Sequence, residues 1–409
     1  MVPPRATGRE QALNDRLATT PIRMADFSLA VYHYDMELAS SLHHLLADFA
    51  FWGPPRAQDP GYRFAHPLPP FEGLTVSRWG WEPRTWKGGI SGTTVDYVLN
   101  QAYTLLALRR LPEPPIVHVQ FLSFLQKKWW DLRWLQVVKR RARALIYTVH
   151  NLMPHDREHD PVLRSKYEQV YRLADHLVVH NEHQHQQLVE QFAIAPNKIS
   201  VLPLGPYFSQ FPLPERSQAR QTLGVRDEPV LLHFGSMRPY KGTESLLQAF
   251  AAWRQQQRQG TLLLAGPASP ARQAELRALI ADLHVQEHVV CRFDFIPAAE
   301  VPRYFAAADV IVLPYLHIDQ SGVLPTALAW GLPAIVSDVG GFREFVGSND
   351  FGYLCEAGSV ASLTAVLARV LEDLPAARTK AARAQAYVQA NHNWDAIAQQ
   401  TAGLYRQFV

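Results

Sequence analysis

Short apolar runs alternate with amphipathic stretches along the second half of the chain. The runs lie at residues 229–234, 261–265, 288–293, 310–314 and 333–337, and a helical periodicity of apolar positions fills the intervals between them. Short buried strands separated by helices of about 10–15 residues are typical of a parallel sheet covered on both faces. The pattern therefore predicts a doubly wound α/β domain.

The first half of the chain follows the same alternation less regularly. We expect its strands at residues 27–34, 49–52, 74–78, 115–120, 145–150, 176–180 and 199–202, and its helices near 36–46, 94–108, 125–141, 162–173 and 182–191. The stretch 207–220 contains Pro212 and Pro214 and interrupts the pattern, as a boundary between two α/β units does. We therefore predict domains at residues 1–208 and 209–391, followed by an amphipathic helix at 392–409.

Composition narrows the class of protein. A chain of 409 residues, 47% of them hydrophobic, can bury two large cores, and a formal net charge of +3 does not favour nucleic-acid binding. Two cysteines, Cys291 and Cys355, exclude a disulfide scaffold and a cysteine zinc site, and fit a reducing compartment. No run approaches the roughly 18–20 apolar residues of a membrane span, and the N-terminus lacks the apolar core of a signal peptide. We expect a cytoplasmic protein.

The loop after the strand at 229–234 carries groups suited to an anion. Gly235 lets a ligand approach the backbone, and Arg238 and Lys241 place two positive charges three residues apart at the edge of the predicted sheet. Such a pair suits a diphosphate, because arginine binds two oxygens and lysine supplies a point charge. The alternative is a polar turn with two solvated cations. The spacing of a Walker loop is absent.

A second candidate anion site follows the strand at 310–314. A polar loop ends there at Ser321, Gly322 and Val323, where the pattern predicts the start of a helix that is closed by Gly331. The free backbone N–H groups at a helix start attract anions. Two such sites in one domain indicate a phosphorylated ligand.

Several spaced motifs, in this order, resemble those of the GT-B glycosyltransferases. The segments that resemble the donor-binding domain are 234–242, 262–266, 295–297, 307–315 and 320–341, and those that resemble the acceptor domain and its last strand are 116–119, 147–155, 177–181 and 203–205. The likeness covers about residues 115–409 and is to the large retaining family that contains many bacterial polysaccharide mannosyl- and glucosyltransferases. It implies two Rossmann-like domains facing a cleft, with the closing helix 392–409 returning to the first domain.

The resemblance also implies roles for particular residues. Arg238 and Lys241 should hold the donor diphosphate, supported by the amides around Gly322. The family carries a pair of glutamates, the second of which grips the nucleotide ribose; their positions here are Ile318 and Thr326, so both are absent. A Gln-Ser-Gly subgroup of the family shows the same departure. The donor-binding candidates are Gly235, Gln320, Ser321, Gly322, Val323, Thr326 and Asn181, with Asp319 as a weaker contact to the sugar.

Among seventeen histidines, His150 is the strongest candidate for a functional role. It ends an apolar strand at the expected edge of the sheet, and the resemblance implies a histidine of the acceptor domain that contacts the donor sugar. His118 and Asn151 are weaker candidates, and His155 is weaker again. Zinc binding by the residues of the 180–185 segment is conceivable, but its histidines lack a common face, so we expect no metal.

Residues 126–143 combine seven basic residues with Trp129, Trp130 and Trp134. Basic residues interleaved with tryptophan on a helix favour an anionic membrane surface, with the rings at headgroup depth. The alternative is a helix whose tryptophans pack against the sheet and whose basic face is solvated. Exposure of the tryptophans decides between the two.

These observations favour a glycosyltransferase that moves a hexose from a nucleotide-diphosphate sugar to a glycan or lipid-linked acceptor. Cations and amides suffice to stabilise the leaving diphosphate, so we expect no metal or other cofactor. The likeness implies retention of configuration and a role in surface polysaccharide or glycolipid synthesis, with the enzyme peripheral at the inner face of the membrane. The alternative is a catalytically inactive nucleotide-sugar-binding partner or regulatory subunit. The missing glutamates favour this alternative, whereas the intact cations argue against it. A sugar-nucleotide epimerase or a phosphorylase is less favoured.

Overall fold

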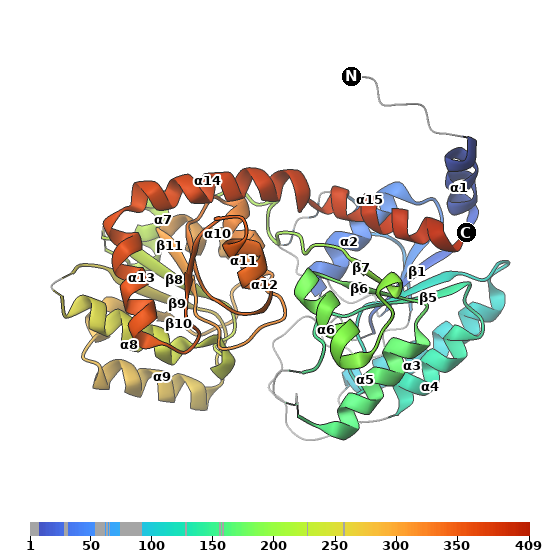
Figure 1. The fold of residues 1–409 in the computed structure, drawn as a ribbon, viewed down its shortest axis with the longest axis horizontal. Helices are drawn as coiled ribbons and strands as arrows, with labels where there is room; N and C mark the ends of the chain where they lie inside the picture. Colours follow the sequence, from blue (N-terminus) through green and yellow to red (C-terminus); the bar gives the residue numbers. More distant parts are fainter. Residues whose placement is uncertain are drawn as a thin grey trace. The chain divides into compact units, whose positions relative to one another are not determined.

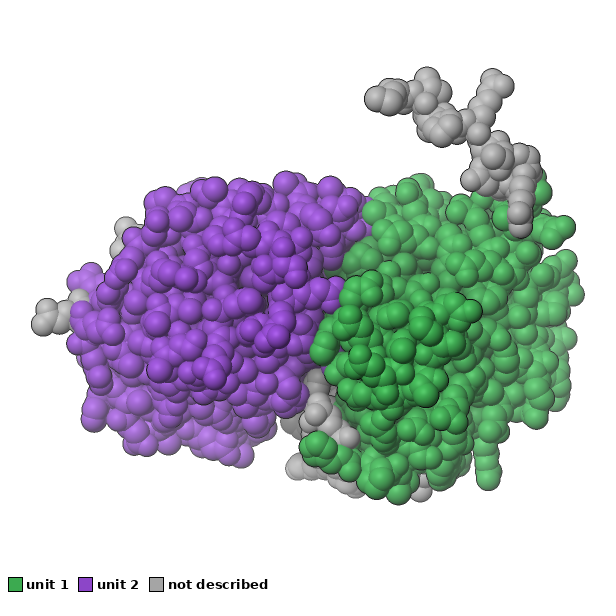
Figure 2. Space-filling view, in the orientation of Figure 1, with its two compact units in different colours: residues 1–58, 64–204, 394–409 green, residues 59–63, 205–393 purple. Residues whose placement is uncertain are grey.

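The computed structural model describes residues 8–27, 32–53, 62, 64, 66–73, 92–126, 129–154, 157, 159–226, 228–256 and 258–409. It is built from layers of helices on parallel sheets (Figure 1). The chain divides into two compact units (Figure 2). Unit 1 comprises Met1–Gln58, Phe64–Leu204 and Trp394–Val409, and unit 2 comprises Asp59–Arg63 and Gly205–Asn393.

Unit 1 contains a sheet whose seven described strands are all parallel, in the order β3-β2-β1-β4-β5-β6-β7. The strands are β1 (Ile22–Ala25), β2 (Phe49–Trp52), β3 (Phe71–Glu72), β4 (Ile116–Val119), β5 (Ala144–Thr148), β6 (His176–Val179) and β7 (Ile199–Val201). The central strands are buried along their whole length because helices cover both faces.

The helices of unit 1 are α1 (Gly8–Thr19), α2 (Tyr32–Leu45), α3 (Gly92–Arg110), α4 (Trp130–Lys139), α5 (Pro161–Leu173), α6 (Glu182–Phe192) and α15 (Trp394–Tyr405). Apolar residues of α3 to α6 form one core with the sheet, and α2 and α15 pack against each other in the same unit (Figure 1). The start of α5 follows from its sequence, since the Asp160 carboxylate accepts a hydrogen bond from the Leu163 N–H and Pro161 occupies the first turn.

Unit 2 contains a second sheet, whose six described strands are parallel in the order β10-β9-β8-β11-β12-β13. The strands are β8 (Val230–Phe234), β9 (Thr261–Ala265), β10 (Val289–Arg292), β11 (Val310–Leu313), β12 (Ala334–Ser337) and β13 (Tyr353–Cys355). The strand order reverses between β8 and β11, and ligands of open α/β sheets bind beyond the carboxyl ends of the strands at such a point.

Helices cover both faces of this sheet (Figure 1). One core joins the sheet to α8 (Thr243–Arg254), α9 (Pro270–Asp282) and α13 (Val360–Glu372), and the other joins it to α7 (Arg216–Leu223), α10 (Val301–Ala307), α11 (Val323–Ala329) and α14 (Leu374–Asn391). The remaining short turns include the 3-10 helix Pro239–Lys241. The two sheets confirm the doubly wound α/β prediction in both halves of the chain.

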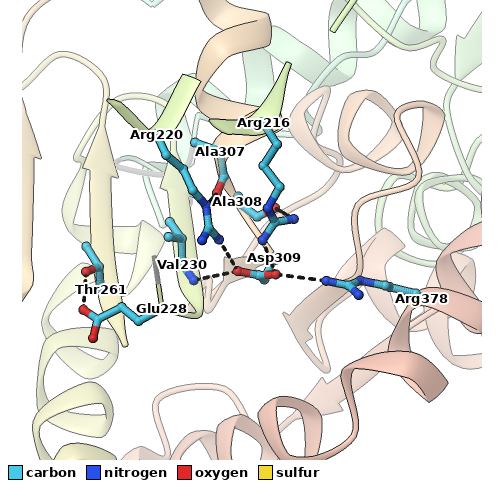
Figure 3. Close-up of polar contacts among 9 residues, drawn as sticks. All are labelled: Arg216, Arg220, Glu228, Val230, Thr261, Ala307, Ala308, Asp309 and Arg378. Carbon is cyan, nitrogen blue, oxygen red and sulfur yellow. Dashed lines mark hydrogen bonds and ion pairs between the residues drawn. The ribbon is translucent and has the colours of Figure 1, made fainter. Parts of the chain in front are cut away.

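Asp309 links several elements of unit 2 at the amino edge of its sheet (Figure 3). Its buried carboxylate accepts hydrogen bonds from Arg220 Nη2 at 2.7 Å, from the Val230 N–H at 2.9 Å and from Arg378 Nη2 at 3.2 Å, and it pairs with Arg216 as well. The network ties α7 and α14 to the first residues of β8 and β11. These arginines therefore serve the fold at the edge opposite the loops predicted to bind an anion.

The largest error of the pattern lies at the first strand. Residues 27–34 were expected to form it, whereas β1 is Ile22–Ala25 and α2 begins at Tyr32. β1 contains the buried Arg23, whose guanidinium pairs with Asp48 at 2.7 Å and with Glu72 at 3.3 Å. Because these ion pairs let a charged residue enter a central strand, β1 does not look apolar in the sequence.

Other boundaries also moved. The expected strand at 74–78 lies outside the described residues, and the helix expected from 125 begins at Trp130. Helix α7 lies within the proline-bearing stretch and was not predicted, nor were α14 and β13. The units meet in sequence between Leu204 and Gly205, and α15 belongs to unit 1.

Candidate functional site

Gly235 follows β8 directly and has a backbone conformation that favours glycine. Its φ is +111°, and its N–H donates a hydrogen bond to the Ala265 carbonyl at 2.8 Å. A Cβ placed on Gly235 would lie 2.7 Å from Lys241 Nζ and 3.9 Å from Val323 Cγ2. The backbone conformation therefore disfavours any side chain at this position. The ends of the Lys241 and Val323 side chains thus lie beside the Gly235 backbone at the carboxyl end of the sheet.

Lys241 is a buried cation without a carboxylate partner. Its side chain is 8% exposed, and Nζ lies 5.1 Å from the centre of the Tyr315 ring. Burial lowers the pKa of Lys241 below its usual value, and the neighbouring Arg238 lowers it further. Tyr240 acts in the opposite direction and raises this pKa. No described carboxylate forms an ion pair with this ammonium group. An anion in the space above Gly235 would supply the missing counter-charge.

Arg238 lies three residues before Lys241 in the same loop, and its side chain is exposed. It precedes the 3-10 turn Pro239–Lys241 in extended conformation, and its carbonyl accepts a hydrogen bond from the Lys241 N–H at 3.0 Å. The loop therefore presents one buried and one solvated cation at the same edge. This arrangement can neutralise a group that carries two negative charges.

The other predicted anion site begins α11. The Ser321 hydroxyl accepts a hydrogen bond from the Val323 N–H at 3.3 Å, and residues 319–323 are all half-buried, including Asp319 and Gln320. A Cβ on Gly322 would lie 2.0 Å from a ring carbon of Tyr207. The helix has only seven residues. Its start is therefore packed against an aromatic ring as well as facing the edge of the sheet.

Thr326 is used inside the unit. Its side chain is buried, its hydroxyl donates to the Gly322 carbonyl at 2.7 Å, and it accepts a hydrogen bond from the Tyr207 N–H at 2.8 Å. Thr326, a donor-binding candidate, thus contacts the chain segment that enters unit 2. Thr326 therefore positions Tyr207.

His118, a weaker candidate for a contact on the acceptor side, has a structural role in unit 1. The ring is fully buried, with Nδ1 at 2.7 Å from the Tyr405 hydroxyl and Nε2 at 2.8 Å from Thr148 Oγ1. Burial lowers the pKa of His118 to about 3, so the ring is neutral. Because both nitrogens are bonded, His118 connects β4 to β5 and α15 within unit 1.

His150 lies at the carboxyl end of β5 and pairs with His180. His180 Nδ1 lies 3.0 Å from the Leu202 carbonyl oxygen, and its Nε2 lies 3.1 Å from His150 Nδ1. A carbonyl only accepts, so His180 carries its proton on Nδ1, and burial lowers its pKa to about 4. His180 Nε2 is then an acceptor, and His150 Nδ1 must donate to it. Burial lowers the pKa of His150 as well, which leaves its Nε2 unprotonated and able to accept a hydrogen bond.

The remaining unit 1 candidates flank this pair. Asn181 caps α6, since its side-chain oxygen accepts a hydrogen bond from the Gln184 N–H at 2.8 Å, and Gln184 in turn accepts from the His180 N–H at 2.9 Å. Asn151 follows His150 and is half-buried. His155 lies outside the described residues. Asn181 therefore caps the helix, and this role accounts for an asparagine at the position without a ligand.

The tryptophans of the basic segment divide between surface and core. Trp129 is 45% and Trp130 47% exposed, whereas Trp134 is buried and donates a hydrogen bond to Thr104 Oγ1 at 3.0 Å. Two of the seven basic residues, Lys127 and Lys128, lie outside the described residues. Lys139 pairs with Asp175 and Arg143 with Glu113, while Arg133, Arg140 and Arg141 are exposed. The described part of residues 126–143 therefore combines one tryptophan in the core with two on the surface.

Two family models match the chain, one for each half. Residues 39–205 match the model described as Glycosyltransferase Family 4, and residues 228–373 match the model described as Glycosyl transferases group 1. The chain belongs to the group 1 glycosyltransferases. The matched ranges correspond to the two sheets, and the second contains the loop with Arg238 and Lys241. The resemblance seen in the sequence is confirmed.

Curated relatives of this group 1 glycosyltransferase include D-inositol 3-phosphate glycosyltransferases. That of Kineococcus radiotolerans is 30% identical over 261 residues, which is 59% of this chain and 59% of the relative. That of Corynebacterium efficiens is 26% identical over 83% of this chain and 78% of the relative. The chain thus spans less than two thirds of the length of the first of these relatives.

Solved structures share the GT-B fold over almost the whole chain. Sucrose-phosphate synthase from Thermosynechococcus elongatus superimposes with a TM-score of 0.76 at 22% identity, covering 95% of this chain and 98% of that protein. HepE of Anabaena, solved in complex with UDP and glucose, gives a TM-score of 0.71 at 20% identity, covering 94% and 99%. These similarities show that this group 1 glycosyltransferase has the GT-B fold.

Two aromatic residues at the candidate donor site of this glycosyltransferase were missed in the sequence. Tyr315 lies under the Lys241 ammonium group, and Tyr207 lies on Gly322. Tyr315 directly follows the strand predicted at 310–314, so its position could have been noticed, but Tyr207 lies more than a hundred residues before Gly322. Among the described residues, no group of three or more His, Cys, Asp or Glu side chains is arranged to hold a metal ion.

Proposed function

We propose that this group 1 glycosyltransferase is an active enzyme that transfers a hexose from a nucleotide-diphosphate sugar to a glycan or lipid-linked acceptor. The observation that carries the proposal is the buried Lys241, whose ammonium group lies beside the Gly235 backbone and forms no ion pair with a described carboxylate. A buried cation of this kind is stable only with a counter-charge, and a diphosphate supplies one. The presence of UDP in the structures of a GT-B neighbour supports a nucleotide donor.

Bond cleavage places negative charge on the leaving nucleoside diphosphate. Lys241 and Arg238 are fixed in one loop before the reaction, so they stabilise that charge without reorganisation. We propose that these cations make a divalent metal unnecessary. We also propose retention of configuration, in which the acceptor hydroxyl attacks from the face that the diphosphate leaves, so that no enzymatic nucleophile is required.

His150 completes the proposal from unit 1. The hydrogen-bond chain from Leu202 through His180 leaves Nε2 of His150 as an acceptor. We propose that it accepts a hydrogen bond from a hydroxyl of the sugar, as the resemblance implied. Its pKa is lowered by burial, so the ring stays neutral when the sugar binds.

We propose that the acceptor is reached at an anionic membrane surface, in the synthesis of a surface polysaccharide or glycolipid. Trp129 and Trp130 are exposed beside Arg133, and α3 adds the exposed apolar residues Val98 and Leu106. Basic and aromatic residues together favour binding at the interface of an anionic bilayer. No helix in the described part of the chain combines the length and apolar character needed to cross a membrane.

The alternative is a nucleotide-sugar-binding partner without catalysis, which the absence of carboxylates at Ile318 and Thr326 favours. One experiment separates the two. We expect slow donor hydrolysis, or transfer to a lipid or glycan acceptor, with one member of a panel of UDP-, GDP- and ADP-sugars, both with and without EDTA. Tight binding of a nucleotide sugar without turnover would establish the binding partner. Activity lost in EDTA and restored by a divalent ion would contradict metal independence alone.

A further inference from the structure

The segment that enters unit 2 places an aromatic ring on the first turn of α11. Three ring carbons of Tyr207 lie 2.0–2.8 Å from the position that a Cβ on Gly322 would occupy. Gly322 is therefore required by the ring. The next residue is Val323, and its Cγ2 would lie 3.9 Å from a Cβ on Gly235, the glycine beside the Lys241 ammonium group. Val323 thus follows the residue on which the ring lies, and it is near the loop that carries Lys241.

Two hydrogen bonds hold the segment in place. The Tyr207 N–H donates to Thr326 Oγ1 at 2.8 Å, and the Phe208 N–H donates to the Tyr62 hydroxyl at 3.1 Å. Between these contacts the chain turns sharply, because Phe208 adopts a left-handed conformation with φ of +60°. The Tyr207 ring is thereby fixed from its own backbone and is not a free surface side chain.

The conformation of Phe208 costs free energy, since a bulky residue seldom has a positive φ. Aromatic packing offsets that cost: the Tyr62 ring lies 5.4 Å from Phe208 and 5.8 Å from Phe211, between ring centres. Strained backbone that is held by its surroundings is concentrated at ligand sites, where it fixes a side chain in advance. Here the side chain that it fixes is Tyr207.

The Thr326 side chain in the first turns of α11 is used within the fold. The Thr326 hydroxyl proton is bonded to the Gly322 carbonyl, and the Tyr207 N–H is bonded to Thr326. Both acidic positions that the resemblance assigns to donor binding are occupied by Ile318 and Thr326. The half-buried face of an aromatic ring is the feature that this turn offers.

We propose that Tyr207 is a donor-binding residue, whose ring packs against the nucleoside half of a nucleoside diphosphate. Thr326 acts as a positioning residue for that ring. The proposal rests on the proposed function, because it takes the phosphates to lie at Lys241. Rings of this kind bind nucleosides by stacking, which every base permits. Recognition at this turn is then by shape and stacking and uses no carboxylate.

Binding of UDP, GDP and ADP, compared with binding of inorganic pyrophosphate, tests the inference. Pyrophosphate has the charges but no nucleoside. We expect Tyr207→Ala to weaken the best-bound nucleotide about tenfold to hundredfold, the range for one lost aromatic–base contact, and to leave pyrophosphate affinity unchanged. Tyr207→Phe should bind as the wild type does. Tyr207→Leu, which fills the space on Gly322 without an aromatic face, should behave as Tyr207→Ala.

Thr326 provides a second and independent test. Thr326→Val keeps the shape but removes both hydrogen bonds, so it should weaken nucleotide binding and leave pyrophosphate binding intact. Thr326→Ser keeps the hydroxyl and should restore wild-type affinity. In turnover assays both Tyr207→Ala and Thr326→Val should raise KM for the donor more than they lower kcat.

Equal losses for nucleotide and pyrophosphate, or no loss for either, would overturn the assignment of Tyr207. Loss for the intact nucleotide sugar alone, with nucleotide affinity unchanged, would place the ring against the sugar and overturn it as well. A wild-type protein that binds neither nucleotide nor pyrophosphate would refute the proposed function itself. Thermal unfolding of each variant identifies those that fail to fold. If Tyr207→Ala or Thr326→Val does not fold, Tyr207→Leu and Thr326→Ser still test the proposal.

Discussion

At the scale of single residues, Lys241 is a charged side chain whose burial is unfavourable. Burial opposes its charged form, as the lowered pKa shows, and no described carboxylate compensates. The face of Tyr315 supplies a weak attraction at 5.1 Å, and the glycine at position 235 has no side chain to crowd Nζ. A charged group that costs stability in this way is expected where an anion binds.

We predict that Lys241→Met reduces turnover roughly 30- to 1,000-fold, since one preorganised donor to a developing anion contributes about 2–4 kcal/mol. Arg238→Ala should also reduce turnover, but less strongly, because the Arg238 side chain is solvated. Thermal unfolding of Lys241→Met should occur at or above the wild-type temperature, because an apolar chain of similar length replaces a buried ammonium group.

The matched control is Lys380→Met in the same unit, where the lysine pairs with Asp350 at the surface. It should leave turnover unchanged. Wild-type turnover in Lys241→Met would refute the role of the buried cation.

At the scale of elements, unit 1 contains a cluster of neutral histidines that joins strands and helices. His118 connects β4, β5 and α15, and His180 bonds both Leu202 and His150. The Tyr34 ring of α2 packs edge-on against His150 and against Trp394 of α15. Helix α15 therefore adds its aromatic residues to a core made by the N-terminal part of the chain.

This cluster predicts that unit 1 loses stability in mild acid. Burial lowers the pKa of His118 to about 3 and that of His180 to about 4, against about 6.5 in the unfolded chain. As pH falls below 6.5 the unfolded chain takes up protons that the folded state refuses, so stability is present above pH 6.5 and is lost progressively toward pH 4. Thermal unfolding measured from pH 7.5 to 4.5 checks this.

His118→Gln should flatten this pH dependence, because it removes one of the titrating groups. Thr148→Val removes a hydrogen-bond partner of the ring and keeps the imidazole, so it should lower stability but retain the wild-type slope. Equal slopes in His118→Gln and the wild type would show that His118 does not contribute.

At the scale of the whole molecule, the two units carry different surfaces. Five of the large apolar residues that are exposed in the described part of the chain belong to α3 or to the start of α4: Val95, Val98, Leu106, Trp129 and Trp130. Exposed arginines lie in and beyond α4. Unit 1 thus combines exposed apolar groups with positive charge, which is typical of a surface that binds an anionic interface.

We predict that the protein cosediments with vesicles containing phosphatidylglycerol at low salt and is released at high salt. The exposed Arg133, Arg140 and Arg141 contribute about 1 kcal/mol each before screening. Replacing both Trp129 and Trp130 by Ser should weaken binding, whereas Tyr387→Ser, on α14 of unit 2, should not. Absence of binding at low salt would remove the membrane proposal and favour a soluble acceptor.

The sequence by itself determined the fold class and pointed to one loop as a candidate donor site. Both follow from local information: the period of apolar residues identifies strands and helices, and the carboxyl end of a strand identifies the edge where Gly235, Arg238 and Lys241 lie. Where local information misleads, the prediction was wrong. The apolar run 27–34 was taken for a strand, and β1 was missed because the ion pairs of Arg23 are made with residues far along the chain.

Only the tertiary structure decided which candidates are bonded within the fold. It bonded both nitrogens of His118 and the hydroxyl of Thr326 within the fold, and it placed Tyr207 on Gly322. It also exposed Trp130 while burying Trp134 four residues later on the same helix. A side chain's partners depend on segments distant in sequence that converge when the sheets form, and no local pattern contains that information.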